Sequence, residues 1–393
     1  MTASAPGRAF VHVGVAKTGT TYLQTVLEGN RRRLAADGVG LPGPRMTAHF
    51  YAAQDLRGIA FGGHTHPAVP GAWDRLAADI ARWSGRSVVV SHEMLAGSTE
   101  EQIARAAASV HGRELHVVLT ARDLGRQIPA MWQETVKNGR AIPFRRYLKR
   151  LARPRERAEG RGFWRGQDIA AVLRRWSSVA PPERIHVVTV PARSASAPPD
   201  ELWRRFSRAC DLDRVRCDTE VARRNVSLGL AEAELLRRLN QRLADRFDWP
   251  RREQLVKRHL AEGVLARRQS TPRVEVPPQL RSWVAEQSAD IVARLARAGY
   301  DVVGSLDDLL PVWPADTAAP DEPHPDDLVD AALDALTALL DDAADRPAQH
   351  LHVSATRMRD SAAHVARELL RHPVRLLRSA SRASQSSRKR RNP

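Results

Sequence analysis

Short apolar runs alternate with longer amphipathic segments along the first two hundred residues of the chain. The apolar runs span 10–13, 87–91, 115–120 and 184–190, and each is short and rich in β-branched residues. Between them apolar residues recur at helical spacing, which predicts helices at 19–37, 73–83, 100–110, 124–138, 143–152 and 163–179. Alternation of this kind predicts an α/β fold, with a parallel β-sheet flanked by helices.

From about residue 200 the pattern is mostly helical, with predicted helices at 200–210, 229–246, 250–268 and 278–298. We expect one α/β domain over 1–314 and a helical C-terminal extension. Residues 315–349 form an acidic, alanine-rich helical segment in this prediction. Residues 350–393 carry eleven basic and two acidic residues and are predicted to be partly helical and then disordered. This tail either makes a weak contact with an anionic membrane surface or, as we favour, is solvated or folds back on the acidic segment.

The formal net charge of +17 does not by itself predict a nucleic-acid partner. Arginine supplies almost all of the positive charge, a usage typical of GC-rich genomes, and few aromatic residues accompany the basic runs. We therefore expect no nucleic acid as partner.

The chain has two cysteines, which argues against a disulfide scaffold or a cysteine-based metal site. Without an apolar run of membrane-spanning length or a signal-peptide core, we expect a cytoplasmic protein.

The first apolar run ends in a loop, Gly14-Val15-Ala16-Lys17-Thr18-Gly19-Thr20-Thr21, and a helical pattern follows at once. Unpaired N–H groups and the helix dipole favour an anion at such a helix start. The glycines allow a tight turn, Lys17 adds a positive charge and the threonines add hydroxyl donors. The spacing is not that of a Walker A loop. The loop therefore predicts a phosphate or sulfate site, the alternative being a plain strand–turn–helix junction.

This order of residues resembles the 5′-phosphosulfate-binding loop of sulfotransferases that use 3′-phosphoadenosine-5′-phosphosulfate (PAPS), commonly P-K-[ST]-G-[ST]-[ST]-x-L, with Ala16 in place of the proline. A second segment, where strand 115–120 ends in Ala121-Arg122-Asp123, resembles the family's 3′-phosphate-binding segment. There Leu124 replaces the usual proline and Ala130 the usual serine. The resemblance is specific over about 8–140 and general to about 310, and it implies the P-loop NTPase-like sulfotransferase fold.

The resemblance implies in-line transfer of a sulfuryl group from PAPS to a hydroxyl or amine of a small-molecule or glycan acceptor, without a metal. Lys17 would offset the negative charge of the leaving group. The base that takes the acceptor's proton would lie at the end of strand 87–91, with Glu93 as the first candidate and His92 as the second. The implied donor-binding residues are Lys17, Thr18, Gly19, Thr20, Thr21, Arg122, and Arg224 and Ser227 of a later basic loop. The structural alternatives are a packed His92, a capping Glu93, a surface salt bridge at Arg122 and a helix N-cap at Ser227.

The stretch 46–70 reads as irregular and contains His49, His64 and His66. We interpret it as a loop or lid on the acceptor side, with His49 or His64 as an alternative base. Zinc binding by the last two histidines is disfavoured, because no cysteine is near and the pair is too closely spaced. The acceptor pocket is expected from 44–72 and 140–165. The alternative functions are a P-loop kinase-like phosphotransferase, or a non-catalytic nucleotide-, nucleic-acid- or membrane-binding protein that uses the basic tail.

Overall fold

The computed structural model describes residues 6–153, 158–192, 198–220, 227–243, 246–268, 272–313 and 323–344; of 158–161 it describes the backbone alone. The chain divides into two compact units, Met1–Leu333 and Asp334–Pro393. Helix α14 (Pro325–Ala344) crosses this division. The predicted domain end at 314 and the basic tail at 350–393 both lie outside the described residues, as does part of the acidic segment.

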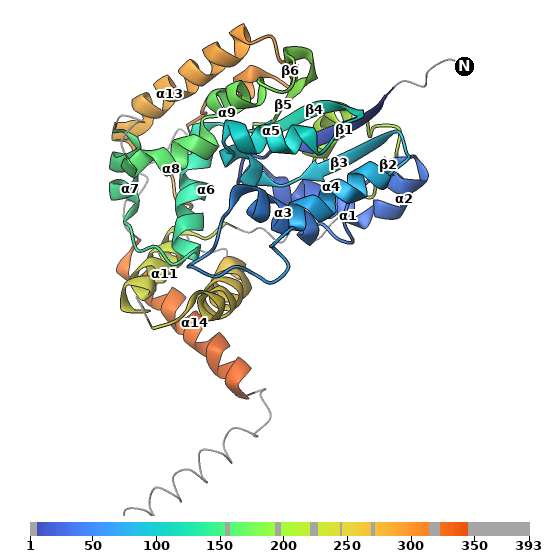
Figure 1. Ribbon diagram of the computed structural model, residues 1–393. Helices are drawn as coiled ribbons and strands as arrows, with labels where there is room; N and C mark the ends of the chain where they lie inside the picture. The colour runs from blue at the N-terminus through green and yellow to red at the C-terminus, as the bar shows by residue number, and fades with distance from the viewer. Residues whose placement is uncertain are drawn as a thin grey trace, which may run out of the picture. The chain divides into compact units, whose positions relative to one another are not determined.

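Six parallel strands form one sheet in the order β2-β3-β1-β4-β5-β6 (Figure 1). Their bounds are β1 Gly7–His12, β2 Val39–Gly40, β3 Ser87–Ser91, β4 Arg113–Ala121, β5 Ile185–Thr189 and β6 Asp301–Val303. Side chains that alternate along β4, such as Val117 and Val118, are both fully buried, so this parallel strand is covered on both faces. The predicted α/β class, a parallel sheet flanked by helices with a helical C-terminal region, is confirmed.

The helices fill the connections between strands. They are α1 Thr20–Gly29, α2 Arg31–Ala36, α3 Thr47–Arg57, α4 Ala72–Arg82, α5 Glu100–Ala108, α6 Leu124–Lys137, α7 Phe144–Leu151, α8 Ala158–Gln167, α9 Ile169–Trp176, α10 Glu201–Ala209, α11 Leu230–Leu243, α12 Trp249–Arg251 and α13 Pro278–Arg297. Short 3₁₀ segments are η1 Glu93–Gly97, η2 Pro182–Arg184, η4 Leu265–Arg267 and η5 Leu306–Leu309, whereas η3 Arg252–Val264 is a π-helix. One core cluster joins Phe10, Val89, Val118 and Val188 of the sheet to α1, α2 and α10.

Several predicted elements differ from the structure in their boundaries. The predicted helix 163–179 is two helices, because Asp168 leaves the helical path and its carboxylate accepts the Ala171 N–H at 3.1 Å. The helix predicted at 19–37 ends and restarts at Asn30, whose amide donates to the Val26 carbonyl at 2.8 Å. The stretch 46–70, expected to be irregular, contains α3, and most of 250–268 has π-helical hydrogen bonding.

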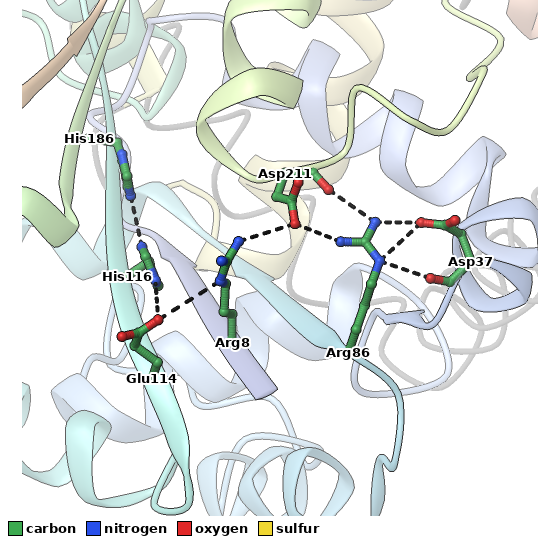
Figure 2. Close-up of polar contacts among 7 residues, drawn as sticks. All are labelled: Arg8, Asp37, Arg86, Glu114, His116, His186 and Asp211. Carbon is green, nitrogen blue, oxygen red and sulfur yellow. Dashed lines mark hydrogen bonds and ion pairs between the residues drawn. The ribbon is translucent and has the colours of Figure 1, made fainter. Parts of the chain in front are cut away.

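A charged network ties the amino ends of the strands together. Figure 2 shows the polar contacts among Arg8, Asp37, Arg86, Glu114, His116, His186 and Asp211. Asp211 accepts hydrogen bonds from Arg8 at 3.2 Å and from Arg86 at 2.9 Å. The rings of His116 and His186 meet at 2.9 Å between Nδ1 and Nε2. Internal partners therefore occupy this edge of the sheet, and the carboxyl edge is the one that carries the predicted site.

Candidate active site

The predicted site residues of the first three segments, from Lys17 to Arg122, lie at the carboxyl ends of three neighbouring strands. β1 lies between β3 and β4, with His12 opposite Ser91 on one side and Val118 on the other. The glycine-containing loop follows β1, His92 and Glu93 follow β3, and Arg122 follows β4. The chain adds β2 and β3 on one side of β1 and then crosses to β4 on the other. Ligands of open α/β sheets bind at such a switch point.

The loop is shaped by two glycines with positive φ, +105° at Gly14 and +90° at Gly19. A Cβ on Gly14 would lie 2.7 Å from the Cα of Glu93, so this glycine lets the loop pack directly against the candidate base. Helix α1 begins at Thr20 with Gly19 at its N-cap, and no described side chain caps it. Its first N–H groups therefore remain free of capping side chains, as an anion site requires.

The loop threonines lie in different environments. Thr18 is buried, and its hydroxyl donates to the Val15 carbonyl at 2.6 Å and contacts the Thr120 hydroxyl at 2.5 Å. Thr20 is also buried, whereas Thr21 is exposed. The Thr18 hydroxyl therefore braces the loop internally, which leaves its backbone N–H as the group that could meet a ligand.

Arg122 lies against the loop, with one guanidinium nitrogen donating to the Lys17 carbonyl at 3.1 Å. Its Nε is buried and has no hydrogen-bond acceptor among the described residues. Burial, followed by the nearby charges of Arg126 and Arg273, lowers the pKa of Arg122 to about 10. A buried donor without an acceptor, close to other cations, is the arrangement that a bound anion would stabilise.

The late basic loop is described only in part. Arg224 lies outside the described residues, and Ser227 is exposed. The next residue, Leu228, is fixed to α6 because its N–H donates to Gln133 at 3.2 Å and its carbonyl accepts from Gln133 at 2.9 Å. Gly229 pairs with Arg273, the same arginine that acts on Arg122. Since α11 begins at Leu230, Ser227 precedes the N-cap position of that helix.

Lys17 forms an ion pair that the sequence did not predict. Its Nζ lies 2.5 Å from Oε2 of Glu134 on α6, and the other oxygen, Oε1, accepts from Lys257 Nζ at 3.0 Å. Lys257 also donates to Asn138 at 2.8 Å. Burial alone would raise the pKa of Glu134, but Lys17 and Lys257 hold it at about 2. Glu134 is therefore an anion within the protein that already neutralises the loop lysine.

A third lysine, Lys137, lies in the same cluster. Its pKa is lowered, first by burial and then by the charges of Lys17 and, more weakly, Lys257. The whole chain has five lysines, at 17, 137, 149, 257 and 389, so three of the five gather around one carboxylate. Lys257 lies on the π-helix η3, a backbone form that is frequent at functional sites. Sequence reasoning missed this cluster, although the scarcity of lysine among sixty-two basic residues was its signal.

His92 and Glu93 are adjacent but differ in what they can accept. The His92 Nδ1 accepts the Met94 N–H at 3.2 Å, so the neutral ring carries its proton on Nε2, which lies 4.0 Å from Glu93 Oε2. Burial lowers the pKa of His92, which keeps the ring neutral. Burial also opposes ionisation of Glu93, yet its pKa is lowered because His92, a backbone N–H, His12 and Gln24 favour the carboxylate. Of the two, Glu93 is the group with an open basic atom.

A buried polar network runs behind the candidate base. His12 contacts Ser91 Oγ at 2.8 Å and Thr120 Oγ1 at 3.2 Å, and burial lowers its pKa to about 4. Gln24 donates to Ser91 Oγ at 3.3 Å and to Glu93 Oε2 at 3.4 Å. The network thus links the base to the loop through Glu93, Gln24, Ser91, His12, Thr120 and Thr18.

The histidines of 46–70 differ from this pair in their roles. His49 is buried, its Nε2 donates to the Pro42 carbonyl at 2.7 Å, and its Nδ1 accepts the Ser91 N–H at 3.0 Å. With both nitrogens engaged, His49 supports the end of β3 and has no free nitrogen for an acceptor. His64 is exposed in a short bridge with Phe61, and His66 is exposed and stacks on Tyr51 with ring centroids 4.6 Å apart.

In the described part of the chain, no helix has the length and apolar character needed to cross a bilayer. The same residues contain no group of three histidine, cysteine or acidic side chains arranged to hold a metal ion.

Comparison with protein-family models finds no match, and no curated protein matches the chain. Among solved structures the chain is similar to a sulfotransferase from Alicyclobacillus acidocaldarius, at 17% sequence identity and a TM-score of 0.39. The similarity covers 76% of this chain and 98% of that one.

Proposed function

We propose that the protein is a sulfotransferase that uses PAPS as its sulfuryl donor. One observation carries the proposal: the Lys17 loop and Arg122 follow adjacent parallel strands, and the guanidinium touches the loop at the Lys17 carbonyl. Together they offer a helix N-terminus without a capping side chain and a buried guanidinium nitrogen without an acceptor, as far as the described residues go. Two anion sites at one sheet edge fit a nucleotide with phosphate groups on both its 3′ and 5′ sides.

The residues would divide the donor between them. The N–H groups of Thr18, Gly19, Thr20 and Thr21, with the Lys17 ammonium, would hold the 5′-phosphosulfate. Arg122 would hold the 3′-phosphate, and Arg224 and Ser227 would reach it from the later loop. Ala130 has no hydroxyl to offer that phosphate where the family has a serine. The positive charge of Arg273 near Arg122 would compensate for part of that missing hydrogen bond.

The donor, when bound, supplies a sulfuryl group on a phosphate leaving group. Lys17 would offset the negative charge that grows on that leaving oxygen, a role that needs a fixed cation more than a proton donor. The Glu93 carboxylate would accept the proton of the acceptor hydroxyl or amine as its oxygen or nitrogen attacks sulfur. His92, whose Nε2 lies 4.0 Å from Glu93 Oε2, would favour the Glu93 carboxylate electrostatically and would not itself take the proton.

Binding of adenosine 3′,5′-bisphosphate tests the donor half of the proposal. Calorimetry should show binding by the parent and a roughly 10- to 100-fold loss in Lys17→Ala and in Arg122→Ala, since each removes charged hydrogen bonds of about 1.5–3 kcal/mol. Lys149→Ala and Arg174→Ala serve as matched controls outside the site. The kinase-like alternative would be favoured if the parent protein bound ATP but not the bisphosphate. A requirement for magnesium in turnover would favour it as well.

Transfer of labelled sulfate from PAPS tests the catalytic half. A screen over carbohydrate, lipid and phenolic acceptors should yield at least one product. Glu93→Gln should lower kcat by roughly 100-fold or more without weakening bisphosphate binding, as expected for loss of a general base. His92→Ala should have a smaller effect. Equal loss in both variants would assign the proton transfer to the histidine or to the pair.

A further inference from the structure

Three arginines converge at the carboxyl end of η1, the segment that begins with the candidate base. Arg165 of α8 donates its Nε hydrogen to the Gly97 carbonyl at 3.1 Å. Arg175 of α9 donates to the Ala96 carbonyl at 2.7 Å and to the Ser98 carbonyl at 3.2 Å. These two guanidiniums hold the last carbonyls of the 3₁₀ segment, as basic residues at helix ends commonly do.

The third, Arg57, ends α3 and differs from the other two. A Cβ on Gly97 would lie 2.6 Å from one of its guanidinium nitrogens, so the group lies against this glycine. Within the described residues Arg57 has no acceptor or ion-pair partner, and its Nε is buried. Asp55, on the same helix, accepts instead from the Gly71 and Trp73 N–H groups at 3.2 and 3.0 Å. Arg57 is thus a half-buried cation that meets no anion in the described part of the chain.

The surroundings of Arg57 favour an external anion. Burial, and then the charges of Arg165 and Arg175, lower the pKa of Arg57 to about 10. Neither Arg165 nor Arg175 forms an ion pair with a carboxylate among the described residues; both donate to carbonyls. A carboxylate, sulfate or phosphate would relieve this repulsion and satisfy the planar guanidinium fork.

The arginine cluster and the candidate base lie at opposite ends of η1. Glu93 begins the segment and Gly97 ends it, which at a 3₁₀ rise of about 2.0 Å per residue separates their backbones by about 8 Å. α3 connects the two ends as well, since Phe50 contacts the His92 ring with centroids 5.3 Å apart and Arg57, seven residues later, ends the helix against Gly97. The charge of Arg57 also acts on His92. Arg57 and Arg165 both lie in or beside the ranges expected to form the acceptor side.

We propose that Arg57, with Arg165 beside it, binds an anionic group of the acceptor, so that the preferred substrate is a negatively charged hydroxyl compound. That the bound anion belongs to an acceptor depends on the proposed function. The anion site itself depends only on the contacts and charge of Arg57. Arg175 donates to backbone carbonyls at the end of η1, so it holds that segment in place and adds positive charge near Arg57.

Calorimetry with sugar pairs that differ in one charge tests the proposal. Methyl glucuronide against methyl glucoside probes a carboxylate, and glucose 6-phosphate against glucose probes a phosphate ester. The parent should bind at least one charged member tenfold or more tightly than its neutral partner. Arg57→Gln should abolish that preference, and Arg57→Lys should keep part of it. Arg165→Gln, which replaces an exposed side chain, should reduce it. Arg174→Gln, on the same helix as Arg175, should leave it unchanged.

Thermal unfolding of each variant checks that the fold is intact; should Arg57→Gln not fold, Arg57→Lys and Arg165→Gln carry the test. A parent without preference for either charged sugar overturns the proposal, and so does a folded Arg57→Gln that keeps the preference. Adenosine 3′,5′-bisphosphate is titrated into the same preparations. If the parent does not bind the bisphosphate, the proposed function is refuted. The anion site at Arg57 is tested only by the measurements with the sugar pairs.

Discussion

Replacing Glu134 by glutamine should weaken the fold and strengthen donor binding at the same time. The carboxylate lies 2.5 Å from the Lys17 ammonium and 3.0 Å from that of Lys257. If Lys17 serves the donor, it must exchange this partner for the donor's anion. Glu134→Gln keeps the shape of the side chain and removes the charge that competes with the donor.

The stability change follows from the pKa of Glu134, about 2 in the folded chain against an ordinary value of 4.5. That difference corresponds to about 3 kcal/mol at 1.36 kcal/mol per unit, for a side chain that is 22% exposed. Because the folded pKa is depressed, this stabilisation is present above pH 4.5 and disappears as the pH falls through about 2. The parent and Glu134→Gln should therefore differ most near neutral pH and converge in acid.

The affinity change has the opposite sign. Glu134 keeps Lys257 when Lys17 turns to the donor, so only the Lys17 share of that stabilisation opposes binding. A share of about 1 kcal/mol or more means that freeing Lys17 should tighten adenosine 3′,5′-bisphosphate binding by roughly fivefold or more. Denaturant unfolding and calorimetry on the same samples measure the two effects. Glu234→Gln is the matched control, since Glu234 is similarly buried and accepts from Arg237 and Arg238 at 2.7 Å. It should lose stability without any gain in affinity.

Weaker bisphosphate binding by a folded Glu134→Gln would refute this reasoning. Glu134 would then be a residue that positions Lys17 for the donor and not a competitor for it. An equal gain in the Glu234 variant would also refute it, because the effect would come from net charge alone.

Two further predictions concern the loop and the sheet. Gly14→Ala should cost more stability than Gly58→Ala, where φ is also positive but no atom lies within 4 Å of the new Cβ, and only Gly14→Ala should abolish bisphosphate binding. His12 and His49 both have pKa values lowered to about 4 by burial, so the unfolded chain binds more protons below pH 6.5. As the pH is lowered, these two rings alone should make the unfolding free energy fall by about 2–3 kcal/mol per pH unit near pH 5, and His49→Gln should reduce the slope by about 1 kcal/mol per pH unit; a flat profile would contradict the buried neutral rings.

The elements set by local pattern were predictable. The four apolar runs are β1, β3, β4 and β5, because a buried parallel strand needs continuous apolar residues in a short segment. β2 has two residues and β6 three, too few for a pattern, and both are fixed by pairing to strands already formed. α3 was missed because its buried face includes His49, which reads as polar but is satisfied by Pro42 and Ser91.

The candidate site divides in the same way. The sequence could bring Lys17, Glu93 and Arg122 together as candidates because each lies within a few residues of the end of a strand, and parallel strands bring their carboxyl ends together. The residues that the sequence did not single out come from elements with no such local signal: Glu134, which pairs with Lys17, from within α6, Lys257, which pairs with Glu134, from η3, and Arg57 from the end of α3. Their role depends on which helix faces which, a property of tertiary packing that spacing along one chain does not encode.

The use of lysine and arginine in this chain connects these observations. Arginine serves almost every basic position, yet three of the five lysines lie near Glu134, where a compact, rotatable ammonium suits a shared carboxylate better than a rigid fork does. Lys17, Lys137 and Lys257 lie in one cluster. Flexible ammonium groups there would suit a negative charge that shifts from one oxygen atom to another during a reaction. Arg122 and Arg57 lie where a fixed planar anion would need to be held. The division of cations thus separates the lysine cluster, which on our proposal would follow a moving charge, from Arg122 and Arg57, which would hold a fixed anion, and Glu134 is the charge that the proposed donor would have to displace from Lys17.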